Sequence, residues 1–242
     1  MFALELKRMP LPRQGRRSLF QITGGCARCR SLNPRLIYRH ASGVRKCRMI
    51  SAIVLAAGKS ERMGRPKALL PFRGRTFLEN ILDAIRQSPV QQTVVVVGHH
   101  REEIEPFVTP PTGMVFNPDY EQGMITSFQA GIRALPTETA GALLFLVDHP
   151  VVHSNTIGLL IGRLAPNRII LPTFEGRRGH PVLFGSNILQ EILALTASQG
   201  ANIVVRKDPS RLVQVPVNSP GILVDIDTPE DFQKLQNAYE SR

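Results

Sequence analysis

The stretch AIVLAAGKSERMGRPKALLPF, residues 52–72, decides the fold class that the sequence predicts. It opens with an apolar run, turns through the small residues Ala56, Ala57 and Gly58, and becomes basic before a second apolar segment begins. A short continuous apolar run is typical of a strand buried inside a parallel sheet. Small residues after such a strand let backbone amides approach a phosphate group or a base edge. We therefore predict an α/β fold with an anion site at the end of its first strand.

Four cations, Lys59, Arg62, Arg65 and Lys67, follow Gly58. A solvated surface loop is the simplest alternative, but their place directly after a buried strand favours anion binding. The stretch is not a P-loop, which needs a Lys directly after its last Gly, and it contains no G-x-G-x-x-G dinucleotide motif. A phosphate site of another kind is expected.

Strand-like and helix-like patterns alternate from Ile50 onward. The strand-like runs cover residues 51–56, 93–98, 142–148, 168–172, 181–185, 212–217 and 222–226. The helical patterns cover residues 76–87, 123–135, 154–165 and 228–240. Ser154 and Thr228 are expected as N-caps, and Pro229 as the first residue of the last helix. The alternation predicts one domain over residues 49–242, with a mostly parallel sheet covered by helices.

The first 48 residues differ in composition from the rest of the chain. They hold 12 Lys and Arg and a single acid, Glu5, whereas residues 49–242 hold 18 basic and 18 acidic residues. The overall charge of +11 therefore belongs to this extension, whose few aromatic residues argue against specific nucleic-acid recognition. We expect residues 1–48 to be a basic, disordered extension. Two interpretations stay open: a translation start placed upstream of Met49, or an arm that resembles an organelle transit peptide.

All three cysteines, Cys26, Cys29 and Cys47, lie in the extension. Together with His40 they suggest a zinc site, but their irregular spacing and the lack of a surrounding apolar core argue against it. Residues 49–242 contain no cysteine and need no disulfide, so we expect a cytoplasmic location. No apolar run approaches the ~20 residues of a membrane span, so no membrane partner is expected.

Carboxylates follow two of the apolar runs. Asp148 ends the run at residues 142–148, and Asp225 and Asp227 lie at the end of the run at residues 222–226. Ligands of open α/β sheets gather at the carboxyl ends of the strands, and Mg²⁺ takes one or two carboxylates plus substrate phosphates. We therefore predict a Mg²⁺ site formed by Asp148 and Asp225. Asp227 is a secondary ligand candidate, since it can instead cap the last helix.

Two further segments have the character of binding loops. In NPDYEQGMITS, Gly123 and Ser127 open a helix whose first amides can meet a ribose or a phosphate. In GRRGHP, Arg177, Arg178, Gly179 and His180 come just before a strand. A basic hairpin is the simpler interpretation of GRRGHP, but two arginines beside a histidine also indicate a second anion site.

These motifs together resemble the MobA-like NTP transferases, and within them the molybdenum cofactor cytidylyltransferase branch. The matching segments are LAAGKSERMGRPKALLPF, NPDYEQGMITS, LVDHP, GRRGHPVLF and DIDTPEDF, which span most of residues 51–232. The resemblance implies a Rossmann-like nucleotidyltransferase fold of the nucleotide-diphospho-sugar transferase type, with a mixed sheet. It also implies a Mg²⁺-dependent reaction of an NTP with a phosphorylated acceptor, which releases pyrophosphate.

The resemblance also implies roles for individual residues. The loop from Leu55 to Lys67 resembles the triphosphate site, in which Arg62 and Lys67 neutralise charge as pyrophosphate leaves. Asp148 and Asp225 resemble the metal ligands, and GRRGHP resembles part of the acceptor site. Guanylyltransferases of the family resemble this loop but carry Gly where this chain has Ala57, so CTP is expected rather than GTP. His149 stands where the family often has a different polar residue, and its role stays open.

The expected function is transfer of CMP from CTP to the phosphate of a molybdopterin-type cofactor, for delivery to a molybdenum hydroxylase as client. Three alternatives remain. A guanylyltransferase or a sugar or small-phosphate nucleotidyltransferase would keep the chemistry and change the substrates. A non-catalytic cofactor-binding partner of a molybdenum hydroxylase is disfavoured by the presence of Lys67, Asp148 and Asp225 together. Nucleic-acid binding through the basic extension is the fourth interpretation.

Overall fold

The computed structural model describes residues 37–39, 45–47 and 49–240. The chain divides into two units, and all that is described belongs to the second, Leu32–Arg242. Cys26, Cys29 and His40 lie outside the described residues, so the structure gives no view of the zinc site considered for them. Within the basic extension, β1 (Ile37–Arg39) and β2 (Arg45–Cys47) pair as an antiparallel hairpin.

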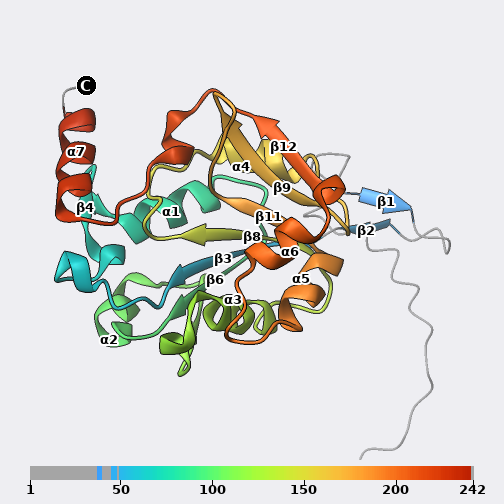
Figure 1. Ribbon diagram of the computed structural model, residues 1–242, viewed down its shortest axis with the longest axis horizontal. Coiled ribbons are helices and arrows are strands. Elements are labelled where there is room, and N and C mark those ends of the chain that lie inside the picture. The colour runs from blue at the N-terminus through green and yellow to red at the C-terminus, as the bar shows by residue number, and fades with distance from the viewer. Residues whose placement is uncertain (1–36, 40–44, 48, 241–242) are drawn as a thin grey trace, which may run out of the picture. The chain divides into compact units, whose positions relative to one another are not determined.

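An eight-stranded mixed sheet forms the centre of the second unit (Figure 1). Its strand order is β10-β9-β11-β8-β3-β6-β7, and β12 pairs with β9 beside this path. The bounds are β3 Met49–Ala56, β6 Gln92–Val97, β7 Gly113–Phe116, β8 Thr139–Leu146, β9 Ile169–Phe174, β10 Arg177–Arg178, β11 Val182–Gly185 and β12 Leu212–Pro216. Strands β8, β3, β6 and β7 are parallel, whereas β11 runs antiparallel to both β8 and β9. The predicted fold class is confirmed.

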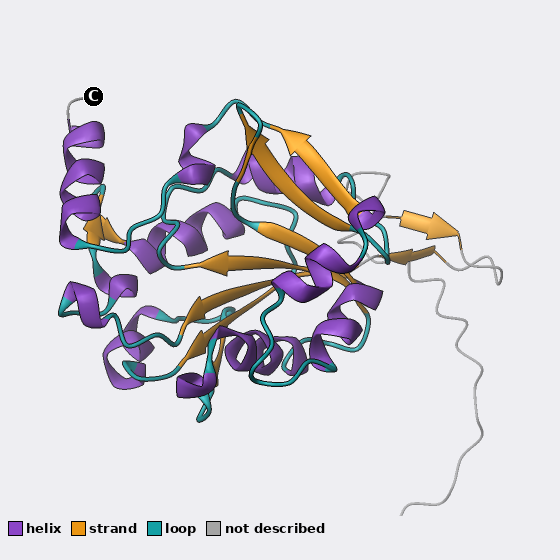
Figure 2. Ribbon diagram, viewed as in Figure 1, coloured by secondary structure: helices purple, strands orange, loops and turns teal. Residues whose placement is uncertain are grey.

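Helices cover both faces of the sheet (Figure 2). On one face, α1 (Phe77–Arg86) and α4 (Ser154–Ile161) pack over Ala52 and Val54 of β3. On the other face, α3 (Met124–Arg133), α5 (Ser186–Leu193) and α6 (Asn202–Lys207) cover Ile53 and Leu55. Successive side chains of a strand point to opposite faces, so an uninterrupted apolar strand is the expected solution for a sheet buried on both sides.

The last helix, α7 (Pro229–Glu240), packs against the edge of the domain rather than on the sheet. Phe232 and Leu235 join a third apolar cluster with Phe72 and Phe77, near the small hairpin of β4 (Pro71–Phe72) and β5 (Arg75–Thr76). The helix α2 (Arg101–Ile104) is a single turn after β6. None of the helices described between residues 49 and 240 has the length and apolar character needed to cross a membrane.

Two local predictions are wrong. Residues 222–226 are not a strand: Pro220–Leu223 form a 3-10 turn, and the chain then continues without regular structure. The run is apolar because Ile222 and Ile226 are buried in the core, and not because it pairs in the sheet. Ser154 is not an N-cap, because it is already the first residue of α4; His153, in extended conformation, takes the N-cap position.

Thr228 is confirmed as the cap of the last helix. Its hydroxyl accepts a hydrogen bond from the Asp231 amide at 3.2 Å, and the Asp231 carboxylate accepts in return from the Thr228 amide at 3.1 Å. Helix α1 begins with the same reciprocal arrangement, made by Thr76 and Glu79. Such capping boxes satisfy two backbone donors that the first turn leaves unpaired.

Candidate active site

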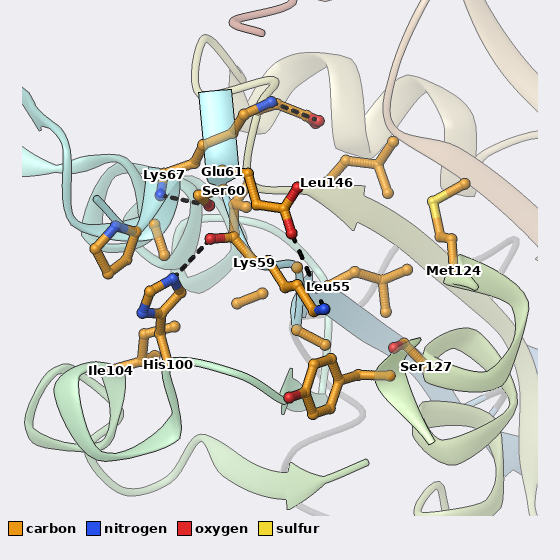
Figure 3. A pocket seen from close by; sticks show the side chains of 18 of the residues that line it. Leu55, Lys59, Ser60, Glu61, Lys67, His100, Ile104, Met124, Ser127 and Leu146 are labelled. Carbon is orange, nitrogen blue, oxygen red and sulfur yellow. Dashed lines mark hydrogen bonds and ion pairs between the residues drawn. The ribbon is translucent and has the colours of Figure 1, made fainter. Parts of the chain in front are cut away.

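A cavity of about 470 Å³ opens at the carboxyl ends of β3 and β8 (Figure 3). Parallel pairing of β3 with β6 and β8 brings the three strand ends, Ala56, Val97 and Leu146, to the same edge of the sheet. The lining residues include most of those predicted for the nucleotide, namely Leu55, Ala56, Ala57, Gly58, Arg62, Lys67 and Ser127, together with the predicted metal ligand Asp148. The strand-end rule therefore located the cavity correctly.

The basic loop after β3 folds back on itself through two short turns. Ser60 and Gly64 have left-handed backbone conformations, with φ of 54° and 66°, on either side of the 3-10 turn Glu61–Met63. The Ser60 hydroxyl accepts a hydrogen bond from the Lys67 amide at 3.1 Å, which closes the loop. This closure brings Lys67, at the start of a second 3-10 turn, back to the mouth of the cavity (Figure 3).

The small residues of the loop leave room on its cavity side. A Cβ atom added to Gly58 would meet no atom within 4 Å, and Gly58 lines the cavity. On the protein side the packing is tight, because a Cβ on Gly98, after β6, would lie 2.6 Å from the Ala57 carbonyl oxygen. The Ala57 backbone therefore packs closely against Gly98, whereas a side chain on the neighbouring Gly58 would point into open space.

Lys67 is the centre of an ion-pair cluster. Its side chain is only 12% exposed, and its Nζ lies 2.6 Å from Asp227 Oδ1 and 3.7 Å from Asp148 Oδ2. Arg62 Nη2 also contacts Asp227 Oδ1, at 3.1 Å. The hydrogen bond from Lys67 holds the pKa of Asp227 below its ordinary value. The structure therefore places Asp227 as the counterion of two cations.

Asp148 also belongs to a second group, with His149 and Asp225, whose possible ligand atoms all lie within 4.8 Å of one another. Asp148 Oδ1 is buried without a hydrogen-bond partner, and burial raises the pKa of Asp148 against the opposing charges of His149 and Lys67. Asp225, in contrast, is exposed. Two carboxylates and an imidazole are suitable ligands for a divalent cation, and one of the carboxylates, Asp148, has a buried oxygen without a hydrogen-bond partner.

His180 joins this group through its ring. The rings of His149 and His180 stack with centroids 4.4 Å apart and planes inclined by 30°. Burial, with a smaller effect of His149, lowers the pKa of His180 to about 3, so the ring is neutral. Its backbone amide donates to the Ile222 carbonyl oxygen at 3.0 Å, which joins GRRGHP to the segment that leads to Asp225.

Comparison with models of protein families identifies the family of this chain. Residues 52–214 match the model of the MobA-like NTP transferase domain. The chain belongs to this family. The match covers β3 through most of β12, so it includes the whole cavity described above.

Relatives of this MobA-like chain have varied names. It is 29% identical over 201 residues to the nicotine blue oxidoreductase of Paenarthrobacter nicotinovorans, which covers 77% of this chain and 96% of the relative. It is also 29% identical over 197 residues to the molybdenum cofactor cytidylyltransferase of Escherichia coli, which covers 78% and 97%. A probable molybdenum cofactor guanylyltransferase of Bacillus cytotoxicus is 28% identical over 151 residues, covering 60% and 73%.

Solved structures share the fold. A nucleotidyl transferase from Methanothermobacter superposes with a TM-score of 0.70 and 25% identity, covering 80% of this chain and 98% of that one. Rv0371c from Mycobacterium tuberculosis, solved in complex with manganese, superposes with a TM-score of 0.67 and 26% identity, covering 78% and 99%. The MobA-like chain is therefore a nucleotidyltransferase by family and by fold.

Several predicted residues lie away from the cavity wall. Gly123 does not line it, although the next residue, Met124, and Ser127 of α3 do. Arg177 and Arg178 are exposed on β10, the short strand of the expected basic hairpin. Gly179 packs tightly, since a Cβ there would lie 2.3 Å from the Ile222 carbonyl oxygen. Of the GRRGHP residues, only His180 touches the metal-ligand group, through its stack on His149.

Among the residues that line the cavity, His100 was not selected by the sequence analysis. His100 Nε2 lies 2.9 Å from the Lys59 carbonyl oxygen (Figure 3). Lys59 Nζ lies 2.7 Å from Glu121 Oε1, so the loop after β6 and the turn before α3 both contact the basic loop. Tyr120, which belongs to the predicted binding loop NPDYEQGMITS, also lines the cavity. The signal was present, because GHH follows the second apolar strand directly, where the strand-end rule applies.

Proposed function

We propose that the protein transfers CMP from CTP to the phosphate of a molybdopterin-type molybdenum cofactor and releases pyrophosphate. The observation that carries the proposal is the position of Lys67: a mostly buried cation at a nucleotide-sized cavity, 3.7 Å from a carboxylate of the Asp-His-Asp group. A cation site beside a basic loop is the equipment of nucleotidyl transfer. The cytidylyltransferase relative and the Ala57 methyl group support CTP as the donor.

The reaction needs charge control more than a general base. The acceptor phosphate is already anionic and attacks the α-phosphorus of the NTP; a P–O bond forms, and the bond from the α-phosphorus to the bridging oxygen breaks. A divalent cation, expected to be Mg²⁺, would be held by Asp148 and Asp225 and would screen the repulsion between the two phosphates. Lys67 and Arg62 stabilise the charge that moves onto pyrophosphate, and the backbone of Leu55, Ala56, Ala57 and Gly58 orients the base and the triphosphate.

The acceptor is assigned to the GRRGHP segment, which reaches the Asp-His-Asp group through the stack of His180 on His149. His180 and Gly179 are fixed against Ile222, whereas Arg177 and Arg178 are exposed and free to meet an incoming anion. Ser127 and the start of α3 after Gly123 would contact the nucleotide from the opposite side. We assign catalysis to residues 49–242, the cytoplasm as compartment, and a molybdenum hydroxylase as client.

The test is pyrophosphate release by the full chain with each of the four NTPs, with and without molybdenum cofactor. We expect release only when CTP and the cofactor are present together, and Asp148→Asn should remove most of it. Release with GTP instead would favour a guanylyltransferase, in line with the guanylyltransferase relative. Release with another phosphorylated acceptor would change the substrate class, and tight cofactor binding without any release would indicate a non-catalytic partner.

A further inference from the structure

His149 is close to Asp148 but is not hydrogen-bonded to it. The Nε2 atom of His149 lies 3.9 Å from Asp148 Oδ1, beyond the usual donor–acceptor distance of about 2.7–3.2 Å. Two ligands each about 2.1 Å from one ion are separated by about 3–4 Å across the coordination sphere. The separation therefore suits two ligands of a shared cation better than a hydrogen-bonded pair.

The surroundings of His149 fix the ring in this position. Its backbone amide donates to the Leu146 carbonyl oxygen at 3.1 Å, directly after β8. Its ring stacks on His180, and its side chain is only 14% exposed. Neither Asp148 Oδ1 nor His149 Nδ1 has a hydrogen-bond partner. The group thus presents fixed donor atoms whose bonding capacity is unused.

We propose that His149 is a third protein ligand of the cation held by Asp148 and Asp225, and that its nitrogen biases the site toward Mn²⁺ relative to Mg²⁺. Mg²⁺ is a hard cation bound through oxygen ligands, whereas Mn²⁺ belongs to the series of divalent first-row metals that sites with nitrogen as well as oxygen ligands bind, although it is the weakest binder of that series. A nitrogen donor therefore strengthens Mn²⁺ binding more than Mg²⁺ binding. This inference rests on the proposed function, since it concerns the cation that the proposed reaction uses.

Pulsed electron paramagnetic resonance with Mn²⁺ alone, on the full chain without nucleotide, tests the ligand directly. We expect the ¹⁴N modulation of a coordinated imidazole, replaced by the ¹⁵N pattern when histidine is ¹⁵N-labelled. In His149→Gln the nitrogen signal should disappear. The control His153→Gln should keep it, because His153 is exposed and outside the metal-ligand group.

Metal titration supplies a second readout. For His149→Gln we expect the Mn²⁺ dissociation constant to rise about tenfold or more, since loss of even an outer-shell partner typically costs that much. The Mg²⁺ constant should change by less than about threefold, because Mg²⁺ relies on oxygen ligands and water. Equal weakening of both ions would overturn the selectivity.

Two results would overturn the ligand assignment: bound Mn²⁺ in the wild type without nitrogen coupling, or coupling that survives in His149→Gln and is lost in His180→Gln. The wild-type labelling result needs no variant, so it holds even where a substitution disturbs folding. Pyrophosphate release separates this inference from the proposed function. Turnover with CTP but no nitrogen coupling would contradict only the assignment of His149 as a metal ligand. Nitrogen coupling without turnover on any NTP would contradict only the proposed reaction.

Discussion

Lys67 joins parts of the chain that are far apart in the sequence. Its partner Asp227 is 160 residues away, just before α7, and Asp148 follows β8. Without a nucleotide, these carboxylates neutralise the cation that is proposed to meet the triphosphate. Phosphates bound there would have to displace or share the Lys67 ammonium group, and the divalent cation proposed for Asp148 would offset the repulsion that remains.

Replacement of Lys67 by Ala should slow turnover and weaken NTP binding together. Its interaction with the phosphates strengthens as charge moves onto the leaving pyrophosphate, so the loss in kcat/KM is expected to be roughly 10²–10³-fold. Steady-state kinetics with CTP would measure both parameters. Lys207→Ala, which removes a cation from an exposed pair with Glu191, is the matched control and should leave them unchanged. Wild-type kinetics in Lys67→Ala would place Lys67 outside the reaction.

Ala57→Gly should relax the preference for CTP over GTP. Ala57 lines the cavity and its backbone packs closely against Gly98, so we expect its methyl group to limit the room for a larger base. One methyl group in a binding site is typically worth about 1–3 kcal/mol, or roughly 10–200-fold in specificity. We expect the ratio of kcat/KM for CTP to that for GTP to decrease by a factor in this range, while the variant still uses CTP. A wild type that uses both nucleotides equally well would contradict the role assigned to Ala57.

At the residue scale, the sequence predicted which chemical groups gather and not how they pair. Strand-end position selected Asp148 after β8, and the basic loop after β3 supplied Lys67, whereas Asp225 was selected from an apolar run that is not a strand. The pairing of Asp227 with Lys67 and the stack of His149 on His180 were missed, because both depend on where α7 and the β10–β11 segment fold back. Spacing along the chain carries no information about such long-range contacts.

At the element scale, helix α1 offers a clean test of pH dependence. Hydrogen bonds from the Thr76 amide and hydroxyl hold the pKa of Glu79 below its ordinary value of 4.5. Between that lowered value and 4.5, the unfolded chain binds more protons than the folded one. The contribution of Glu79 to stability is therefore complete above pH 4.5 and is lost as the pH falls through the folded-state pKa.

Glu79→Gln should remove this contribution to the acid dependence while keeping the capping box, since Gln also serves at that position. The free energy of unfolding from urea titrations between about pH 6 and about pH 3 should fall less steeply in the variant than in the wild type. Other carboxylates contribute equally to both proteins, so the difference isolates Glu79. Parallel pH profiles for the two proteins would show that the Glu79 carboxylate does not titrate differently on folding.

Local sequence signals predicted elements well where they matched local physics. The cap at Thr228, the helical period of α1 and the buried strand β3 could all be predicted from the sequence, because caps and side-chain periodicity act within a few residues. The apolar residues 222–226 misled, because burial by tertiary packing and burial in a strand leave the same pattern. Gly221 shows the tertiary cause: a Cβ there would lie 2.4 Å from Val151 Cγ1.

At the scale of the whole molecule, the sheet order decides what the site contains. Because β8, β3 and β6 are parallel neighbours, the basic loop, Asp148 and His100 meet at one edge. The antiparallel β11 then returns its first residues to this edge, which places His180 beside His149. Alternating patterns predicted a mostly parallel sheet and the family resemblance implied a mixed one, but neither gave the direction of β11, since a pattern does not name a strand's neighbours.

This convergence predicts that nucleotide and cation stabilise the whole domain as a linked pair. A ligand that binds only the folded state, present at 100 times its dissociation constant, adds about 2.7 kcal/mol to the free energy of unfolding. For a domain of this size, each kcal/mol typically raises the Tm by about 2–4 °C. CTP with Mn²⁺ or Mg²⁺ should therefore raise the Tm by roughly 5–10 °C. CTP alone should raise it less, because Asp148 and Asp227 then repel the phosphates.

GTP at the same concentration should give a smaller shift, and Lys67→Ala should lose most of the shift with CTP. Thermal unfolding followed by circular dichroism measures all four conditions. Equal shifts with and without the cation would mean that the cation adds nothing to nucleotide binding, contrary to the linkage expected from the close approach of Lys67 to both Asp148 and Asp227.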